Sequence, residues 1–220
     1  MTSERRKKLK IKGAIFDLDG VLVDTARFHY LAWKEIADEL GIEFTEIQNE
    51  RLKGVSRMAS LEILLEIGHI ELSKQEKEKL AEKKNTRYVQ MLQKLTPSDT
   101  LPGVRQLLET LRGNGVRIAL GSASKNAHFI LEQLEIKSLF DVVVDGNAVS
   151  KAKPDPEVFL LGAQGMGLRP EECVVFEDSV AGIEAGNTCG MYTVGVGSPE
   201  ILGEADQVVL NLGEWQGNGE

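Results

Sequence analysis

Short apolar runs rich in valine and isoleucine recur along the chain, and a segment with helical periodicity follows each of them. The runs are residues 14–16, 116–120, 142–144, 174–176, 193–194 and 208–210. They lack polar alternation, which is typical of strands that are buried on both faces of a sheet. The repeated order of strand and helix predicts an α/β fold with a Rossmann-like parallel sheet wrapped by helices.

The segment between the first and second runs is far longer than a crossover helix needs, and most of it has helical periodicity. One predicted helix has an apolar face made of Phe28, Leu31, Ile36 and Leu40. Ser73 and Glu76 form a capping-box pattern at the start of a second, charged helix that extends to about Leu95. We therefore expect a helical domain at 25–96, inserted after the first strand into a core domain of 1–24 and 97–220, with hinges that let it open and close.

Composition excludes several classes of function. The chain has 220 residues, with 26 Lys and Arg against 34 Asp and Glu, and a formal net charge of −8. This acidic balance argues against nucleic-acid binding, which requires a clustered basic face. The apolar runs are much shorter than the roughly 20 residues that span a membrane. Cys173 and Cys189 match neither a disulfide framework nor a zinc site. We expect a cytoplasmic protein with no membrane or nucleic-acid partner.

Two aspartates, Asp17 and Asp19, directly follow the first predicted strand, and Gly20 permits a tight turn after them. In an extended chain alternate side chains share a face, so both carboxylates would point the same way at the carboxyl end of the strand. Open α/β sheets bind ligands at that edge. Two close carboxylates suit a hard divalent cation, or a nucleophile with an acid/base partner. A polar turn without chemistry is the alternative.

Further polar segments follow later strands of the predicted sheet. Ser122 and Ser124 end the second strand, Lys153 precedes a helix, and Glu177 with Asp178 follows another strand. Serine-rich turns can bring hydroxyl and backbone N–H groups to phosphate oxygens. Each segment alone is compatible with a helix cap or a solvated surface group. Because they occur in this order on successive strand ends, the functional interpretations of these segments support one another.

Together these segments resemble the haloacid dehalogenase superfamily of phosphotransferases, whose signature is an Asp-x-Asp loop, a Ser or Thr at a strand end, a lysine and a terminal acidic pair. The resemblance extends from about Lys12 to Val209 and implies that the helical insertion is the cap domain of that superfamily. Within it, the chain is similar to the β-phosphoglucomutase family in stretches outside the general signature. Those stretches are 24–26 with His29 and Trp33, 52–57, 84–85 with Tyr88, and 122–126.

The resemblance implies a role for each residue of the core motifs. Asp17 would be the nucleophile that forms an aspartyl-phosphate, and Asp19 the general acid/base. Ser122 and Lys153 would hold the transferring phosphoryl group. The Mg²⁺ ligands that it implies are Asp17, Asp19 through its backbone carbonyl, Glu177 and Asp178.

The resemblance also implies a set of substrate-binding residues. They are Thr25, His29, Trp33, Lys53, Gly54, Val55, Ser56, Arg57, Ser60, Lys84, Ser124, Lys125 and Asn126. Thr25 and His29 match positions tied to cap closure, with Lys84 as a partner of His29. A packed apolar role is the alternative for Trp33. Arg57 suits the phosphate that is not reacting, because its planar fork binds a phosphate bidentately; an ordinary surface arginine is the alternative.

We therefore expect a Mg²⁺-dependent, monomeric enzyme acting on a small sugar phosphate. One candidate is an isomerase that converts β-glucose 1-phosphate to glucose 6-phosphate through glucose 1,6-bisphosphate. The other is a sugar-phosphate phosphatase, in which water instead of a sugar hydroxyl attacks the aspartyl-phosphate. The segment that ends at Arg57 favours the mutase. A phosphate-binding module without activity is a third reading, which the complete set of acids and Lys153 disfavours.

Overall fold

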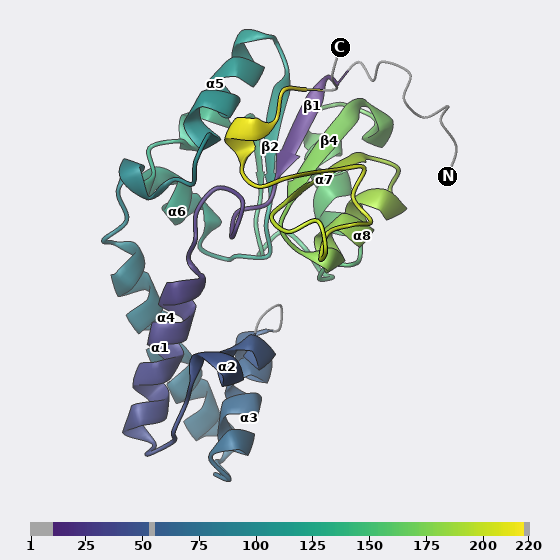
Figure 1. The fold of residues 1–220 in the computed structure, drawn as a ribbon. Helices are drawn as coiled ribbons and strands as arrows, with labels where there is room; N and C mark the ends of the chain where they lie inside the picture. The colour runs from purple at the N-terminus through teal and green to yellow at the C-terminus, as the bar shows by residue number, and fades with distance from the viewer. Residues whose placement is uncertain (1–10, 53–55, 218–220) are drawn as a thin grey trace. The chain divides into compact units, whose positions relative to one another are not determined.

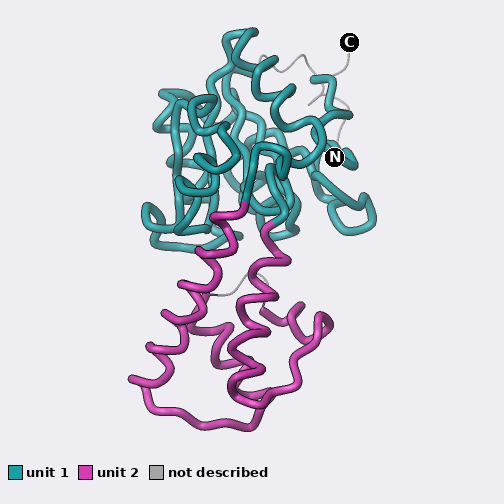
Figure 2. Tube along the Cα trace, turned by 90° about the vertical axis from the view of Figure 1, so that its left-hand side faces the viewer, with its two compact units in different colours: residues 1–24, 95–220 teal, residues 25–94 magenta. Residues whose placement is uncertain are grey.

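The computed structural model describes residues 11–52 and 56–217. It divides into two compact units, residues 1–24 with 95–220 and residues 25–94 (Figure 2). The substrate contacts predicted at Lys53, Gly54 and Val55 lie outside the described residues.

A six-stranded parallel sheet forms the centre of the first unit (Figure 1). The strand order is β3-β2-β1-β4-β5-β6, and every pair of neighbours is parallel. The strands are β1 (Gly13–Phe16), β2 (Arg117–Gly121), β3 (Val142–Val144), β4 (Cys173–Glu177), β5 (Tyr192–Val196) and β6 (Gln207–Val209). This arrangement confirms the predicted α/β fold with a parallel sheet.

Helices pack on this sheet and bury its central strands. They are α5 (Val104–Gly113), α6 (Ala127–Gln133), α7 (Glu157–Gly165) and α8 (Val180–Thr188), and the 3₁₀ turns are η3 (Pro97–Asp99), η4 (Lys137–Leu139), η5 (Pro170–Glu172) and η6 (Leu212–Glu214). Helix α5 packs on β2, α7 on β1, β2 and β3, and α8 on β4 and β5. Every residue of β1 and β4 is buried. The absence of polar alternation in these strands therefore has a physical cause, since neither face meets water.

The strand register brings three carboxyl ends to one level of the sheet. Phe16 of β1 pairs with Leu120 of β2 on one side and with Phe176 of β4 on the other. The rings of Phe16 and Phe176 stack with their centroids 4.5 Å apart and their planes 6° from parallel. Asp17 and Glu177 are the next residues along their strands, so they reach the same edge of the sheet.

The second unit is helical. Its elements are α1 (Ala26–Glu39), α2 (Glu46–Asn49), the 3₁₀ turn η2 (Glu50–Leu52), α3 (Arg57–Ile67) and α4 (Lys74–Leu92). Helices α1 and α4 lie side by side in both views, and α3 also packs on α4 (Figures 1 and 2). The buried side chains between them form a core of their own that includes Trp33, Phe44 and Leu64.

The capping box predicted for α4 is present. The backbone N–H of Ser73 donates to Glu76 Oε2 at 2.8 Å, and the N–H of Glu76 donates to Ser73 Oγ at 3.4 Å. The helix is 19 residues long, but charged residues recur through it. Among the helices of residues 11–52 and 56–217, none is both long enough and apolar enough to cross a membrane.

One predicted core position of α1 is wrong. Leu31 is 44% exposed, whereas Phe28 and Ile36 are buried. Successive helical residues are rotated by about 100°, so the buried residues Ala32, Trp33 and Ile36 define a face from which Leu31 points away. The predicted apolar face was wrong at Leu31 because it was drawn without Ala32 and Trp33, which are both buried.

Candidate active site

Lys153 contacts two carboxylates at the carboxyl edge of the sheet. Its Nζ donates to Asp17 Oδ1 at 2.5 Å and to Glu177 Oε2 at 2.7 Å. The side chains of Lys153, Asp17 and Glu177 are 13%, 11% and 1% exposed. Each comes from a different segment: the end of β1, the loop before α7 and the end of β4. The fold therefore brings together three of the residues that the sequence selected separately.

Asp178 completes a group of three acids with Asp17 and Glu177. Each offers a carboxylate oxygen, and these oxygens all lie within 4.8 Å of one another. Burial raises the pKa of Asp17 well above its ordinary value, against the opposing effect of Lys153. Burial and the charge of Glu177 raise the pKa of Asp178 to about 7. Burial lowers the pKa of Lys153, but the two carboxylates that it contacts raise it by more. A close set of oxygen donors with an excess of negative charge fits a hard divalent cation.

Two glycines make room for these acids. Gly20 has φ +76°, and a Cβ there would lie 2.0 Å from Asp178 Oδ2. A Cβ at Gly182, in the first turn of α8, would lie 2.0 Å from Glu177 Cδ. Any larger residue at either position would therefore displace a carboxylate of the site.

Ser179 holds Glu177 and also caps α8. Its Oγ donates to Glu177 Oε1 at 2.7 Å and accepts from the N–H of Gly182 at 3.1 Å. Its own N–H donates to the same Glu177 oxygen at 3.0 Å. Ser179 was not among the predicted site residues. A serine directly before a helix, next to an acidic pair, is the signal that would have found it.

Asp19 lies outside this group of three acids. Strand β1 ends at Phe16, and Asp19 forms an isolated bridge with Val23. The N–H of Gly20 donates to the carbonyl of Val23 at 2.8 Å, so the chain turns directly after Asp19. The extended conformation assumed from the sequence therefore does not continue through this loop.

The loop after β2 places serine hydroxyls in successive turns. Ser122 is 2% exposed, and its Oγ accepts from the N–H of Ser124 at 3.0 Å. Ser124 Oγ accepts in turn from the N–H of Asn126 at 3.3 Å. A hydroxyl that accepts from the backbone keeps its own O–H as a donor for a phosphate oxygen. Lys125 between these residues is exposed.

A polar cluster lies between α1 and α4 in the second unit. Lys84 is 3% exposed, and its Nζ lies 2.8 Å from His29 Nδ1. The same Nζ lies 5.1 Å from the ring centroid of Trp33 and 4.7 Å from that of Tyr88. Tyr88 donates its hydroxyl to Thr25 Oγ1 at 3.2 Å. The structure thus brings together four of the predicted substrate-binding residues and buries Trp33 among them.

Burial and positive charge shift the protonation of this cluster. Burial, followed by the charges of Lys84 and Arg57, lowers the pKa of His29 to about 3. Burial and the charge of Arg57 lower the pKa of Lys84 to about 7. At neutral pH His29 is therefore uncharged, and its Nδ1 can accept a hydrogen bond from Lys84. The charge of Arg57 opposes the charged form of Lys84, and such a neighbouring positive charge favours an anionic ligand.

Arg57 is the first residue of α3 and is held by α4. Its Nη2 donates to Asn85 Oδ1 at 2.8 Å, and its Nη1 lies 3.8 Å from Glu82 Oε2. Ser56 caps α3 with its hydroxyl, and Ser60 is buried within the same helix. Asn85 was not a predicted site residue, although it stands next to Lys84 in a stretch that carried the family resemblance.

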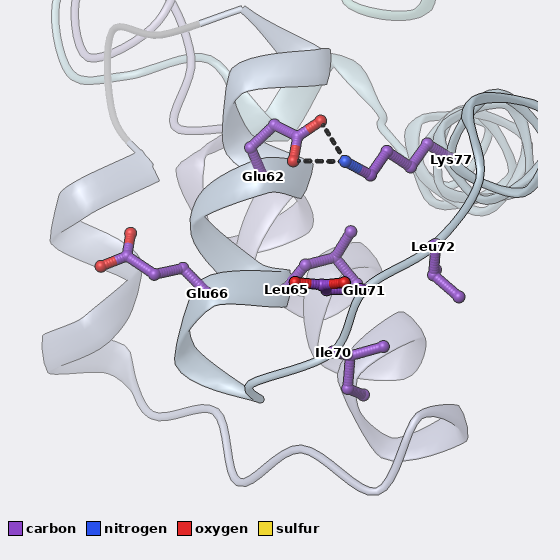
Figure 3. A pocket seen from close by; sticks show the side chains of 7 residues that line it. All are labelled: Glu62, Leu65, Glu66, Ile70, Glu71, Leu72 and Lys77. Carbon is purple, nitrogen blue, oxygen red and sulfur yellow. Dashed lines mark hydrogen bonds and ion pairs between the residues drawn. The ribbon is translucent and has the colours of Figure 1, made fainter.

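A hollow of about 420 Å³ on the second unit is not a candidate phosphate site (Figure 3). Its lining residues are Glu62, Leu65, Glu66, Ile70, Glu71, Leu72 and Lys77. Lys77 donates to both carboxylate oxygens of Glu62 at 2.8 Å. Because this lysine is paired and the lining contains three glutamates, the hollow does not favour an anion.

The parallel sheet and the inserted helical unit agree with the comparisons to known proteins. Residues 11–190 match the haloacid dehalogenase-like hydrolases, and the chain belongs to this family. It is 45% identical over 201 residues to β-phosphoglucomutase from Bacillus subtilis (strain 168), covering 90% of this chain and 89% of that protein. The crystal structure of β-phosphoglucomutase from Clostridium difficile matches with a TM-score of 0.86 and 43% identity, covering 94% of this chain and 93% of that one.

Phosphatases are also among the relatives. The chain is 34% identical over 187 residues to a phosphorylated carbohydrates phosphatase from Thermotoga maritima, covering 84% of each protein. The comparisons confirm the resemblance to the superfamily and to β-phosphoglucomutases.

Proposed function

We propose that the chain is a β-phosphoglucomutase, which interconverts β-glucose 1-phosphate and glucose 6-phosphate through an aspartyl-phosphate and glucose 1,6-bisphosphate. The observation that carries phosphoryl transfer is the contact of Lys153 with both Asp17 and Glu177. It sets a cation beside the carboxylate that would attack phosphorus. The 45% identity to a β-phosphoglucomutase favours transfer between sugar phosphates over hydrolysis.

Asp17 is the proposed nucleophile. Its carboxylate attacks the phosphorus of the bound sugar phosphate, a new O–P bond forms, and the bond from phosphorus to the sugar oxygen breaks. Asp19 is the proposed acid that protonates the leaving oxygen and the base that later removes a proton from the attacking sugar hydroxyl. Ser122 and Lys153 stabilise the charge on the phosphoryl oxygens. Opposite charges about 4 Å apart gain roughly 4 kcal/mol at an effective dielectric near 20.

We propose Mg²⁺ as the cofactor, held by the carboxylates of Asp17, Glu177 and Asp178 and by the backbone carbonyl of Asp19. The three carboxylates supply close, hard oxygen donors, which is the chemistry that Mg²⁺ requires. When bound, Mg²⁺ supplies positive charge that stabilises the transferring phosphoryl group.

Arg57 is the proposed ligand of the phosphate that does not react. A mutase must retain the bisphosphate and bind it in two orientations, which requires a cation remote from the nucleophile. The bond to Asn85 holds one edge of the guanidinium, which prepares the planar fork for a phosphate. The other proposed substrate contacts are Thr25, His29, Trp33, Ser56, Ser60 and Lys84 from the helical unit, and Ser124, Lys125 and Asn126 from the core unit.

A direct assay tests this proposal. The protein is incubated with β-glucose 1-phosphate, MgCl₂ and a trace of glucose 1,6-bisphosphate, and both glucose 6-phosphate and free phosphate are measured. We expect glucose 6-phosphate without an equal release of phosphate, and no product from Asp17→Asn, because the amide is a poor nucleophile of the same size. Release of phosphate alone would assign the phosphatase reaction, which the Thermotoga relative favours. Full activity of Asp17→Asn would contradict the aspartyl-phosphate mechanism.

A further inference from the structure

Glu157 ties together the loop that carries Lys153. It is the first residue of α7, and its Oε2 accepts from the backbone N–H groups of Ser150 at 2.8 Å and Lys151 at 2.7 Å. The hydroxyl of Ser150 donates to Glu157 Oε1 at 2.9 Å. The carboxylate of Glu157, the last residue of the loop 150–157, is thus hydrogen-bonded to the first two residues of the same loop.

Asp155 closes the same loop from inside. Its Oδ1 accepts from the N–H of Glu157 at 3.0 Å, and its own N–H donates to the carbonyl of Ala152 at 3.0 Å. The ammonium group of Lys151 lies 3.1 Å from Asp155 Oδ2. Lys153 lies within this ring of hydrogen bonds, so its backbone position depends on the ring.

The hydrogen bonds of Glu157 and Asp155 form a clamp around the loop 150–157, and this clamp is anchored in the core of the first unit. Val158 and Phe159, which follow Glu157 in α7, are 3% and 0% exposed. The Nζ of Lys153 lies 4.8 Å from the ring centroid of Phe159. Helix α7 therefore fixes both Glu157 and the ring against which the lysine rests.

We propose that Glu157 is a positioning residue that sets the reach of Lys153 to Asp17 and Glu177. This inference rests on the proposed phosphoryl transfer, in which Lys153 holds the transferring group. A lysine has a long flexible stem, so the placement of its ammonium depends on a fixed backbone. Misplacement of a reacting group by about 1 Å can lower a rate by about 10²-fold.

Glu157→Ala and Glu157→Gln separate this role from a general loss of stability. In Glu157→Ala the clamp is lost, and we expect kcat to fall by about 10²-fold. Glutamine keeps an oxygen that can accept both backbone N–H bonds, so Glu157→Gln should recover most of the activity.

Glu172→Ala is the matched control. Glu172 ends the 3₁₀ turn η5 before β4, and like Glu157 its carboxylate accepts a hydrogen bond from a nearby backbone N–H, that of Arg169 at 3.0 Å. Glu172→Ala should show a comparable loss of thermal stability and no loss of kcat. Equal losses of kcat in Glu157→Ala and Glu172→Ala would overturn the proposal.

A double-mutant cycle with Lys153→Met identifies the path of the effect. The affinity for inorganic phosphate, measured by calorimetry, gives a readout that does not need turnover. We expect Glu157→Ala to weaken phosphate binding in the wild-type background and to have no further effect in Lys153→Met. An equal weakening in both backgrounds would show that Glu157 does not act through Lys153. Phosphate binding is measured without the sugar reaction. The positioning role of Glu157 can therefore fail this test while the mutase assay succeeds, and the mutase assay can fail while the positioning role is confirmed.

Discussion

Gly182 shows how one missing side chain permits the site. A Cβ at this position would lie 2.0 Å from Glu177 Cδ, and Glu177 is 1% exposed, so its carboxylate can move away only by displacing buried neighbours. We expect Gly182→Ala to destabilise the protein by about 1–3 kcal/mol, as overpacking does. It should also weaken Mg²⁺ binding, because Glu177 shifts. Urea unfolding and a Mg²⁺ titration measure the two effects.

Gly113→Ala is the control for this prediction. Gly113 ends helix α5, and a Cβ there would meet nothing within 4 Å. An alanine should stabilise the helix by about 0.5–1 kcal/mol and leave Mg²⁺ binding unchanged. If Gly182→Ala behaves like Gly113→Ala, the close approach of Glu177 to α8 is not required.

Asp178 and Asp19 should respond differently to substitution. Asp178 belongs to the group of three acids, whereas Asp19 lies outside it. Asp178→Ala should weaken Mg²⁺ binding by at least tenfold, or about 1.4 kcal/mol, and activity should return in part at high Mg²⁺. Asp19→Asn should keep Mg²⁺ affinity but lower the transfer rate by about 10²- to 10⁴-fold, since proton transfer fails. Metal affinity and rate are measured on each variant. Loss of both in Asp19→Asn would make its side chain a metal ligand.

The sequence could predict which residues gather at the edge of the sheet, but not how they contact each other. Asp17 directly follows β1 and Glu177 ends β4, and parallel strands end at a common edge, so their proximity follows from the strand order. The contact of Lys153 with both of them depends on the path of the loop 150–157. That path is set by side-chain bonds such as those of Glu157, which no local pattern reveals.

At the scale of elements, the packing of α1 against α4 buries Lys84 beside His29. This burial makes the free energy of unfolding depend on pH. The pKa of Lys84 falls from 10.5 to about 7 in the fold. Between these values the unfolded chain binds the proton and the folded chain does not, so stability rises with pH across this window. The largest slope for one proton is about 1.4 kcal/mol per pH unit. We expect Lys84→Met to remove this slope and to stabilise the protein most at pH 7 and below.

Lys83→Met is the matched control one position away in α4. The Lys83 side chain is 46% exposed and pairs with Glu39 at 2.5 Å, a surface contact of small energetic value. Urea unfolding at pH 6 to 10.5 should give parallel curves for Lys83→Met and the wild type. If the free energy of unfolding of the wild type also varied with pH in parallel with that of Lys84→Met, Lys84 would keep its charge in the folded protein.

Local patterns predicted the ends of elements better than their buried faces. The start of α4 could be located from Ser73 and Glu76, because a capping box involves only neighbouring residues. The buried face of α1 could not be read in the same way, since Leu31 is exposed and Ala32 is buried. Which face is buried depends on where α4 packs, and the spacing of large side chains does not determine this.

At the scale of the whole molecule, the proposed reaction divides between two units of the chain. The acids around Lys153 belong to the unit that contains the sheet, and Arg57 belongs to the helical unit. The long segment between the first two strands predicted an inserted helical domain, because a crossover needs far fewer residues. The contribution to specificity that we propose for the helical unit can be tested apart from the chemistry of the core.

Arg57→Ala provides that test, because the proposed mechanism places different demands on Arg57 in two reactions. Transfer between sugar phosphates requires that the distal phosphate is bound. A hydrogen bond to a charged group contributes about 1.5–3 kcal/mol to such binding. We therefore expect the mutase rate of Arg57→Ala to fall by more than about tenfold. Mg²⁺-dependent phosphoryl transfer from acetyl phosphate to Asp17 should change little, since this small donor has no distal phosphate.

Arg51→Ala is the matched control for loss of an arginine from the same unit. Arg51 is 50% exposed and pairs with Glu66 at 3.0 Å, so its removal should leave both reactions unchanged. Arg57→Lys adds a second comparison, because it keeps the charge but loses the planar fork that binds phosphate bidentately. It should recover only part of the mutase rate. An equal fall of both reactions in Arg57→Ala would show a general effect on the enzyme, and a fall in neither would make Arg57 a surface residue whose bond to Asn85 serves only the packing of α3 against α4.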